Sequence, residues 1–289
     1  MKIFEKIKLA LKSLILENYY KIINRFCLGR KIHVAGPVDY IYSLTTFPSR
    51  VDKVYLTIES LFNQNCNFQY KVVIYLSKLQ FPGDKIPKSL SRLVDRGLTV
   101  RFVDGDIRSY KKLNYALIDY PTSSIITVDD DVFYPRWMLK NMIESSCKFP
   151  GDILYFRGSE IVCNDLGDFS KYVNFPLATR KSNHICCIPT GVSGVFYPPG
   201  SLHKDVVDID KFMTLAPFAD DLWYKIMSYL KGTRCRLISN KSIHFTPIMN
   251  TQSVSLRKNN HSENSCNNDS QLENIVSYYR IDRRVFTNK

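Results

Sequence analysis

The chain has 289 residues, of which 45% are hydrophobic and 23% charged, so it has an ordinary globular composition and enough length to bury a core without disulfides. Twelve glycines and thirteen prolines are too few for a collagen-like or low-complexity chain. Forty basic against 27 acidic residues give a net charge of +13, which favours an anionic partner such as nucleotide phosphates, nucleic acid or a membrane surface.

The first segment of the chain holds much of this charge. Residues 1–31 contain eight basic and two acidic residues, so they carry +6 of the +13. Apolar residues recur there at helical spacing, which predicts a basic amphipathic helix within residues 1–35. Two arrangements remain open. The helix packs on the rest of the protein with its apolar face inward, or it lies on an anionic membrane surface with Lys and Arg at the headgroups.

The same segment does not have the pattern of a signal peptide or a membrane span. Lys8 and Lys12 interrupt the apolar run, Glu17 follows it, and no small-residue cleavage site is present. No stretch approaches the roughly 20 apolar residues that a spanning helix needs. We therefore expect a cytoplasmic protein, either free or peripheral on the inner face of the plasma membrane. Its eight cysteines, which form no Cys-x-x-Cys pair, are then expected to be reduced thiols.

Strand and helix patterns alternate along the first half of the chain. Apolar β-branched runs predict strands at 38–44, 70–76, 98–103 and 123–128. Helical spacing predicts helices at 51–62, 88–96, 109–119 and 138–147. This alternation predicts an α/β fold with an open, mostly parallel sheet flanked by helices.

Beyond residue 150 the pattern is weaker. We expect strands at 153–156 and 192–197, a helix at 220–230, one or two strands within 234–245, and a closing helix at 271–279. Residues 158–188 look irregular, and the Asn-rich residues 257–270 look like a loop. No linker rich in Gly, Ser or Pro divides the chain, which favours a single domain over residues 36–289.

Three consecutive aspartates, Asp129, Asp130 and Asp131, follow the predicted strand 123–128. Carboxylates this close raise one another's pKa unless a cation lies among them. Asp129 and Asp131 point the same way from an extended segment, at the strand end where open α/β sheets bind ligands. The pattern therefore predicts an Mg²⁺ or Mn²⁺ site completed by substrate phosphates. The alternative is a solvated acidic turn that caps the helix start at 134–136.

Four segments stand out by their order and spacing: residues 42–64, which contain Glu59, Ser60, Asn63 and Gln64, the three aspartates, residues 191–199, and residues 216–223 (APFADDLW). Together they resemble the family 2-like glycosyltransferases of the GT-A fold. Residues 42–64 resemble the first strand, loop and helix of that family, and the three aspartates fall where that fold carries its metal-binding Asp-x-Asp motif. Residues 216–223 resemble its later acidic motif. Residues 191–199 resemble the strand that leads to the acceptor site of bacterial polysaccharide glycosyltransferases. The resemblance covers about residues 38–280.

The resemblance implies an enzyme, a metal-dependent glycosyltransferase of the hexosyltransferase type. It would move a sugar from a nucleotide-diphosphate sugar, with a UDP-sugar as the expected donor, to a hydroxyl of a bacterial surface glycan or a lipid-linked acceptor, as in lipopolysaccharide biosynthesis. Residues 36–135 would form the nucleotide-sugar half and residues 136–289 the acceptor half. Asp221 is implied as the base that takes the acceptor proton, with Asp220 beside it, and the outcome would be inversion.

The resemblance also implies the binding residues. Asp129 and Asp131 would hold Mn²⁺ or Mg²⁺, and His244 is either a third ligand or a structural residue. The implied donor contacts are Thr45, Phe47, Arg50, Asp104, Lys112 and Asp130. Asp104 and Asp106 would contact the ribose or base, because the second strand ends in Ser77 and Lys78 without the carboxylates that the family often has there. The alternative is that these two residues only form a turn with Gly105. Lys112 would do the phosphate work of the family's arginine.

Two other functions remain open. A metal-dependent nuclease or nucleotidyltransferase would also use the three aspartates, but it predicts basic and aromatic residues interleaved around them. Only Arg136 is basic there, so we expect no nucleic-acid partner. A non-catalytic membrane-surface binding protein would use the N-terminal helix and would leave both acidic motifs unexplained.

Overall fold

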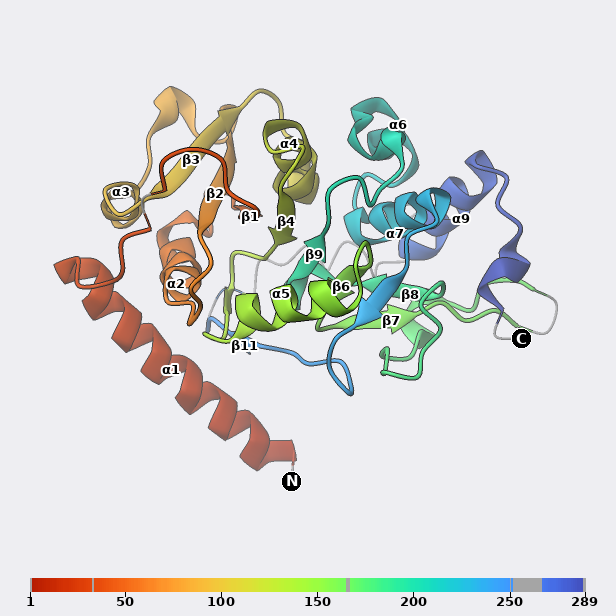
Figure 1. Ribbon diagram of the computed structural model, residues 1–289, viewed down its shortest axis with the longest axis horizontal. Helices are drawn as coiled ribbons and strands as arrows, with labels where there is room; N and C mark the ends of the chain where they lie inside the picture. Colours follow the sequence, from red (N-terminus) through yellow and green to blue (C-terminus); the bar gives the residue numbers. More distant parts are fainter. Residues whose placement is uncertain (1, 33, 165–166, 250, 252–266, 288–289) are drawn as a thin grey trace.

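A seven-stranded sheet runs through the middle of the computed structural model, which describes residues 2–32, 34–164, 167–249, 251 and 267–287 (Figure 1). Its strands are β1 (Tyr40–Thr45), β2 (Tyr70–Ser77), β3 (Leu98–Val103), β4 (Ser124–Thr127), β6 (Ile153–Tyr155), β9 (Val195–Tyr197) and β10 (Cys235–Leu237). They lie in the order β10-β6-β9-β4-β1-β2-β3. β9 is antiparallel to β4 and β6, and the other neighbouring pairs are parallel, which confirms the predicted mostly parallel sheet.

Helices cover both faces of this sheet. The helices are α2 (Val51–Phe62), α3 (Lys88–Val94), α4 (Lys111–Asp119), α5 (Met138–Lys148), α6 (Ile209–Leu215), α7 (Asp220–Lys231) and α9 (Asn268–Tyr278). Side chains on β2 alternate between the two sides, as pleating requires. Val72 and Ile74 join one core with α2, α3 and α5. Val73 and Tyr75 join the other core with α4, α6, α7 and α9. The result is a sheet buried between two helical layers.

Two short antiparallel pairs and several 3₁₀ turns complete the fold. β5 (Val132–Phe133) pairs with β11 (Thr246–Pro247), and β7 (Gly158–Glu160) pairs with β8 (Cys187–Pro189). The turns are η1 (Pro82–Asp84), η2 (Arg108–Tyr110), η3 (Tyr172–Asn174), η4 (Gly191–Ser193), η5 (Lys204–Val207) and η7 (Arg283–Phe286). The expectation that residues 158–188 are irregular is therefore wrong in part, because β7 and the start of β8 lie there.

The strand predicted at 192–197 is also shorter than expected. Residues Gly191–Ser193 form the turn η4, and β9 begins only at Val195, after Gly194 at a φ of +83°. The helix α6 was not predicted. Most of the Asn-rich segment 257–270 lies outside the described residues.

The first helix, α1 (Lys2–Phe26), packs with a mixed polar and apolar side inward, on which Leu16 and Ile23 join Tyr20 in a small hydrophobic cluster. Ser13, Tyr20 and Asn24 are buried. Ser13 Oγ donates a hydrogen bond to the Pro247 carbonyl oxygen (2.8 Å), and Asn24 Nδ2 donates to Glu59 Oε1 (3.1 Å). The arrangement in which α1 turns its apolar face inward is therefore wrong. No helix of the described residues has the length and apolarity to cross a membrane.

A buried ion pair fixes the segment that follows α1. Arg96 Nη1 and Nη2 donate to the two carboxylate oxygens of Glu59 on α2, at 2.6 and 2.9 Å, and both side chains are almost fully buried. Arg96 also donates to the Arg30 carbonyl oxygen. A Cβ at Gly29 would lie 2.0 Å from an Arg96 nitrogen, so only glycine fits there. Glu59, one of the residues that carried the family resemblance, thus has a structural contact here.

Candidate active site

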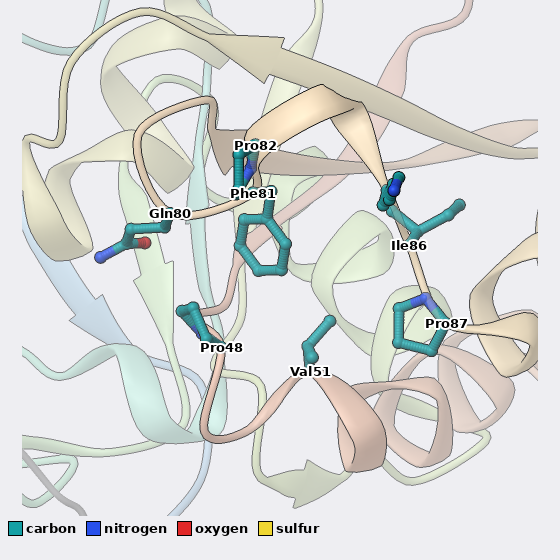
Figure 2. Close-up of a pocket in the computed structure, with 8 residues that line it drawn as sticks. Pro48, Val51, Gln80, Phe81, Pro82, Ile86 and Pro87 are labelled. Carbon is teal, nitrogen blue, oxygen red and sulfur yellow. The ribbon is translucent and has the colours of Figure 1, made fainter.

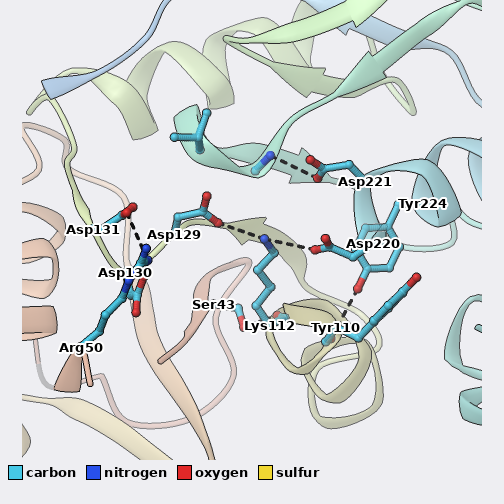
Figure 3. Close-up of polar contacts among 12 residues, drawn as sticks. Ser43, Arg50, Tyr110, Lys112, Asp129, Asp130, Asp131, Asp220, Asp221 and Tyr224 are labelled. Atoms are coloured by element: carbon cyan, nitrogen blue, oxygen red, sulfur yellow. Dashed lines mark hydrogen bonds and ion pairs between the residues drawn. The ribbon is translucent and has the colours of Figure 1, made fainter. Parts of the chain in front are cut away.

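The candidate site lies where the carboxyl ends of β1 and β4 meet. These two strands are neighbours in the sheet, and the chain continues from β1 to β2 on one side and from β4 to β6 on the other. Such a point opens a crevice between the loops that follow the two strands. The loop after β1 carries Thr46 and Arg50. The loop after β4 carries the three aspartates, which Figure 3 shows next to Arg50.

Arg50 and Thr46 hold two of these aspartates. Arg50 Nη1 lies 2.7 Å from Asp130 Oδ1 and 3.1 Å from Asp131 Oδ2. Thr46 Oγ1 donates to the other oxygen of Asp130 at 2.5 Å. Both carboxylates are buried. The Phe47 ring lies 5.3 Å from the Arg50 guanidinium carbon and supports this arginine from the side. The structure therefore brings Arg50, Phe47, Asp130 and Asp131 together.

Lys112, in the first turn of α4, joins the two acidic motifs. Its Nζ lies 3.0 Å from Asp129 Oδ1 and 3.3 Å from Asp220 Oδ2, and the side chain is only 8% exposed (Figure 3). Its backbone carbonyl accepts a hydrogen bond from Ser43 Oγ on β1, which fixes the start of α4 against the sheet. Residues 129 and 220, far apart in the sequence, thus share one ammonium group.

Gly191 completes this contact from the turn η4. A Cβ there would lie 2.7 Å from Lys112 Nζ and 3.1 Å from Asp129 Oδ1, so a side chain would press on the ion pair. The Gly191 N–H donates to Asp221 Oδ1 at 3.3 Å (Figure 3). Asp220 and Asp221 form the first turn of α7, where the helix dipole favours negative charge.

Two tyrosines hold the segment that enters α7. Tyr110 Oη donates to the Ala216 carbonyl oxygen at 2.5 Å, and Tyr224 Oη donates to the Tyr110 carbonyl oxygen at 3.4 Å. Both tyrosines are buried. They connect α7 to the start of α4, and so they fix the distance between Lys112 and the two α7 aspartates.

Burial and mutual repulsion raise the pKa of Asp130, Asp131 and Asp221. Burial, and then the neighbouring Asp129, raise the pKa of Asp131 to about 7. Burial, and then Asp220, raise the pKa of Asp221 well above the usual aspartate range. Burial also raises the pKa of Asp130, although Arg50 opposes it. These carboxyl groups therefore hold protons at higher pH than an exposed aspartate does.

The site has more negative than positive charge. Among the described residues, five carboxylates interact here with two basic side chains. The carboxylates are those of Asp129, Asp130, Asp131, Asp220 and Asp221, and the basic side chains are Arg50 and Lys112. When all are ionised the balance is two positive against five negative charges, or −3. A divalent cation would offset most of this, and carboxylate oxygens suit Mg²⁺ or Mn²⁺. The residues present therefore fit the implied ion.

The expected third metal ligand is not part of this cluster. In the described part of the chain no three His, Cys, Asp or Glu side chains lie together so that they could hold a metal ion. His244 is exposed, and its Nδ1 lies 2.9 Å from the Phe245 carbonyl oxygen. The three-residue set of Asp129, Asp131 and His244 is therefore not assembled. An ion at the aspartates would take its other ligands from substrate phosphates or water.

Two expected donor contacts lie elsewhere. Thr45 Oγ1 donates to the Tyr75 carbonyl oxygen at 2.7 Å, so it ties β1 to β2. Asp104 has a side chain 90% exposed and pairs with Lys78 at 3.0 Å, beyond the end of β3. This hydrogen bond of Thr45 and this ion pair of Asp104 are made with residues other than the three aspartates, Arg50 and Lys112.

Sequence reasoning missed three residues of the network. β1 extends to Thr45, one residue beyond the predicted strand, so it is Thr46 that faces Asp130. Tyr134 Oη accepts from the Asp129 N–H at 2.8 Å and donates to the Val192 carbonyl oxygen at 3.2 Å. Gly191 was noted only as part of a strand. The end of β1 could have been placed one residue later from the sequence alone. The contacts of Tyr134 and Gly191 could not be predicted, because they depend on tertiary packing.

An open cavity of about 400 Å³ lies beside the loop that carries Arg50 (Figure 2). Pro48 and Val51 line it from this loop and the start of α2, and Phe81, Ile86 and Pro87 line it from the segment after β2. Its lining is mostly apolar, which suits a flat ring or an apolar chain rather than phosphates.

Comparisons with known proteins give structural likeness only. No family model matches the chain, and no curated protein matches it. Similar solved structures include S. aureus TarS 1-349 (16% identity, TM-score 0.45, covering 71% of this chain and 59% of that one). Another is the mannosyltransferase PcManGT from Pyrobaculum calidifontis in complex with GDP-Man and Mn²⁺ (15%, 0.46, 80% and 64%). A third is CMP:2-keto-3-deoxy-manno-octonic acid synthetase complexed with CTP (10%, 0.40, 76% and 97%).

The chain spans less than two thirds of the length of the first two solved chains. With identities of 10–16% and TM-scores below 0.5, these similarities assign no function, and the functional conclusion rests on the geometry of the site.

Proposed function

We propose that this protein is a metal-dependent glycosyltransferase of the GT-A type that uses a nucleotide-diphosphate sugar as donor. The observation that carries this proposal is the Lys112 bridge between Asp129 and Asp220. It brings a metal-type acidic motif and a second carboxylate pair to one site at the carboxyl edge of the sheet. The nucleotide-sugar half would be residues 36–135 and the acceptor half residues 136–289, within one domain.

The donor diphosphate would lie at the three aspartates. Asp129 and Asp131 would hold Mn²⁺ or Mg²⁺, which supplies positive charge to the leaving diphosphate when bound. Asp130, tied to Thr46 and Arg50, keeps the loop in place. Lys112 adds a second positive charge close to Asp129 and stabilises the negative charge that develops on the leaving group.

Asp221 would act as the general base. The Gly191 N–H fixes one of its oxygens, and because its pKa is raised, the ionised carboxylate is a stronger proton acceptor than an ordinary aspartate. The acceptor oxygen bonds to the anomeric carbon from the side opposite the diphosphate, the bond from that carbon to the phosphate oxygen breaks, and the proton passes to Asp221. The configuration at the anomeric carbon is inverted. Burial, and then the negative charge of Asp220, keep the pKa of Asp221 high.

The setting of the reaction follows from the family resemblance. We expect a UDP-sugar as donor and a hydroxyl of a bacterial surface glycan or lipid-linked glycan, as in lipopolysaccharide assembly, as acceptor. The reaction would take place in the cytoplasm or at the inner face of an anionic membrane.

The test is a donor screen by thermal shift. UDP-, GDP- and CMP-sugars would be added with MnCl₂ or with EDTA, and sugar transfer or hydrolysis would be followed in parallel. We expect one nucleotide class to raise the melting temperature only with the metal, and Asp129→Asn to lose this shift. Asp104→Asn removes an exposed carboxylate outside the site and serves as the matched control.

Two results would count against the proposal. The first is an absence of any metal-dependent shift with all three donor classes. The second is retention of DNA with a steep salt dependence, which would favour the nuclease alternative.

A further inference from the structure

The outward side of α1 carries an unusually apolar row of side chains. Six of them are between 53% and 67% exposed, and we call them the outer face of α1: Ile7, Leu11, Leu14, Ile15, Ile22 and Phe26. At about 100° per residue they fall on one side of the helix. Surface helices of globular proteins bury such a row against the core, and here the core receives the opposite side.

The opposite side of α1 is fixed by specific contacts, so the helix cannot simply turn over. Ser13 Oγ bonds to the Pro247 carbonyl oxygen, and Arg92 Nη1 donates to Asn24 Oδ1 at 3.2 Å. The Tyr20 ring stacks on Phe133 with centroids 5.8 Å apart. Rolling the helix to bury its apolar row would break all three contacts and would expose Tyr20. The exposed row is therefore a fixed feature of this fold.

Basic side chains flank the outer face on both sides. On the same helical projection Lys8 and Lys12 lie along one border and Lys21 along the other, while Arg25 projects within the face, near its end. All four are exposed. Glu17, one of the two acidic residues of α1, is turned inward and pairs with Lys21 at 2.7 Å. An apolar row between two basic borders matches a lipid bilayer with anionic headgroups, because the long cationic chains reach the headgroups while the row enters the acyl region.

We propose that the outer face of α1 is a docking surface for an anionic lipid bilayer, with the helix lying in the plane of the headgroups. The charge pattern distinguishes this occupant from a second copy of the chain, since two such faces would bring like charges together. The proposal does not depend on the transferase reaction, because it uses no residue of the candidate active site.

The same packing places the membrane close to the site. The inner side of α1 contacts β5 and β11 through Phe133 and Pro247. β5 begins directly after Asp131, and the Ile248 N–H donates to the Asp131 carbonyl oxygen at 2.8 Å. Figure 1 shows α1 running along the side of the molecule that carries α2 and β11. A bilayer on the outer face would therefore be separated from the aspartates by α1 and this two-stranded ribbon, within reach of a lipid-linked acceptor.

The experiment is vesicle flotation with the full chain. Vesicles of phosphatidylcholine would be compared with vesicles that also contain phosphatidylglycerol. We expect binding to the anionic vesicles and at least about tenfold weaker binding to the neutral ones. The variant Leu11→Ser/Ile15→Ser/Ile22→Ser should bind the anionic vesicles at least about tenfold more weakly. The matched control is Ile118→Ser/Val173→Ser/Leu177→Ser, which changes three similarly exposed apolar residues elsewhere and should bind like the unaltered chain.

Three outcomes would overturn the proposal. The unaltered chain fails to float with anionic vesicles, or the α1 variant floats as well as the control variant. The third is a dimer in solution, measured by light scattering, that the α1 variant alone loses, since the face would then belong to a second copy. Sugar transfer to a soluble acceptor should be the same in both variants, so that failure of docking is separable from failure of the proposed activity.

Discussion

At the scale of single residues, Lys112 has the most demanding position in the molecule. Burial alone would lower its pKa, but Asp129, Asp220 and Asp221 together raise the pKa well above its ordinary value. The neighbouring carboxylates therefore keep Lys112 protonated, and its positive charge in turn stabilises these carboxylates.

Lys112→Met should show this dependence. Removing one partner of a buried ion pair leaves uncompensated charge, and we expect the free energy of unfolding to fall by about 3 kcal/mol in urea denaturation with EDTA. Mn²⁺ should restore part of the loss, because it offsets the same carboxylates. Lys78→Met, which breaks the exposed pair with Asp104, should change stability by less than about 1 kcal/mol. Equal losses in the two variants would contradict this picture.

Asp221→Asn tests the proposed base. An amide cannot accept the acceptor proton, so kcat should fall at least about 100-fold while donor affinity stays the same. Calorimetric titration of the donor and steady-state kinetics would separate the two quantities. Asp210→Asn, an exposed carboxylate in the first turn of α6, should leave both unchanged. Turnover that survives in Asp221→Asn would remove Asp221 from the mechanism.

The sequence pointed to the acidic groups of the site more readily than to the uncharged groups that hold them. Asp129, Asp131, Asp220 and Asp221 stand in conspicuous pairs, and burying like charges side by side needs a reason that the sequence can suggest. Gly191 has no such signal, because its role depends on how closely η4 approaches Lys112. His244 was overestimated, since its distance from the aspartates depends on a chain path that the sequence does not reveal.

At the scale of elements, the Glu59–Arg96 pair connects α2, the turn after α3 and the segment after α1. We expect Arg96→Met to lower the free energy of unfolding by about 3–5 kcal/mol, because it leaves the Glu59 carboxylate buried without its partner. Arg101→Met, which breaks an exposed pair with Asp119, should cost less than about 1 kcal/mol. Urea denaturation of both variants makes the comparison, and a similar cost for each would show that the buried pair has no special weight.

Long periodic segments were predictable and short ones were not. The bounds of α2 (Val51–Phe62) and β3 (Leu98–Val103) agree with the sequence prediction. Each has enough residues for the spacing of its apolar side chains to be recognised in the sequence. β7 and β8 have three residues each, and their pairing is visible only after the chain has folded. The helix α1 was predicted from its pattern, but its inverted packing depends on Ser13, Tyr20 and Asn24 finding partners on distant elements.

At the scale of the whole molecule, the buried carboxyl groups should couple stability to pH. The pKa of Asp131 rises to about 7 on folding, so the folded chain binds more protons than the unfolded chain between about pH 4 and pH 7. Stability should then fall as pH rises through this range, by at most about 4 kcal/mol for this one group. Mn²⁺ should stabilise more at about pH 8 than at about pH 5, because it binds the ionised carboxylates. Urea denaturation at several pH values, with EDTA or Mn²⁺, measures both trends.

The variant Asp131→Asn is the control for this pH dependence, since it should flatten part of the slope. A metal-free protein that gains stability as the pH rises from about 5 to about 8 would show that these carboxyl groups do not dominate the balance.

The position of β9 in the chain determines when β4 can gain its second neighbour during synthesis. The four parallel strands β1 to β4 are complete once residue 127 has been synthesised. Their neighbour β9, which pairs with β4, begins only at Val195, 68 residues later. Until then the backbone edge of β4 has no partner strand in the nascent chain. Lys112 also lacks its partner Asp220, because α7 has not been synthesised. We expect wrong pairing with other chains to be favoured while this interval is translated, so chaperone protection would matter then.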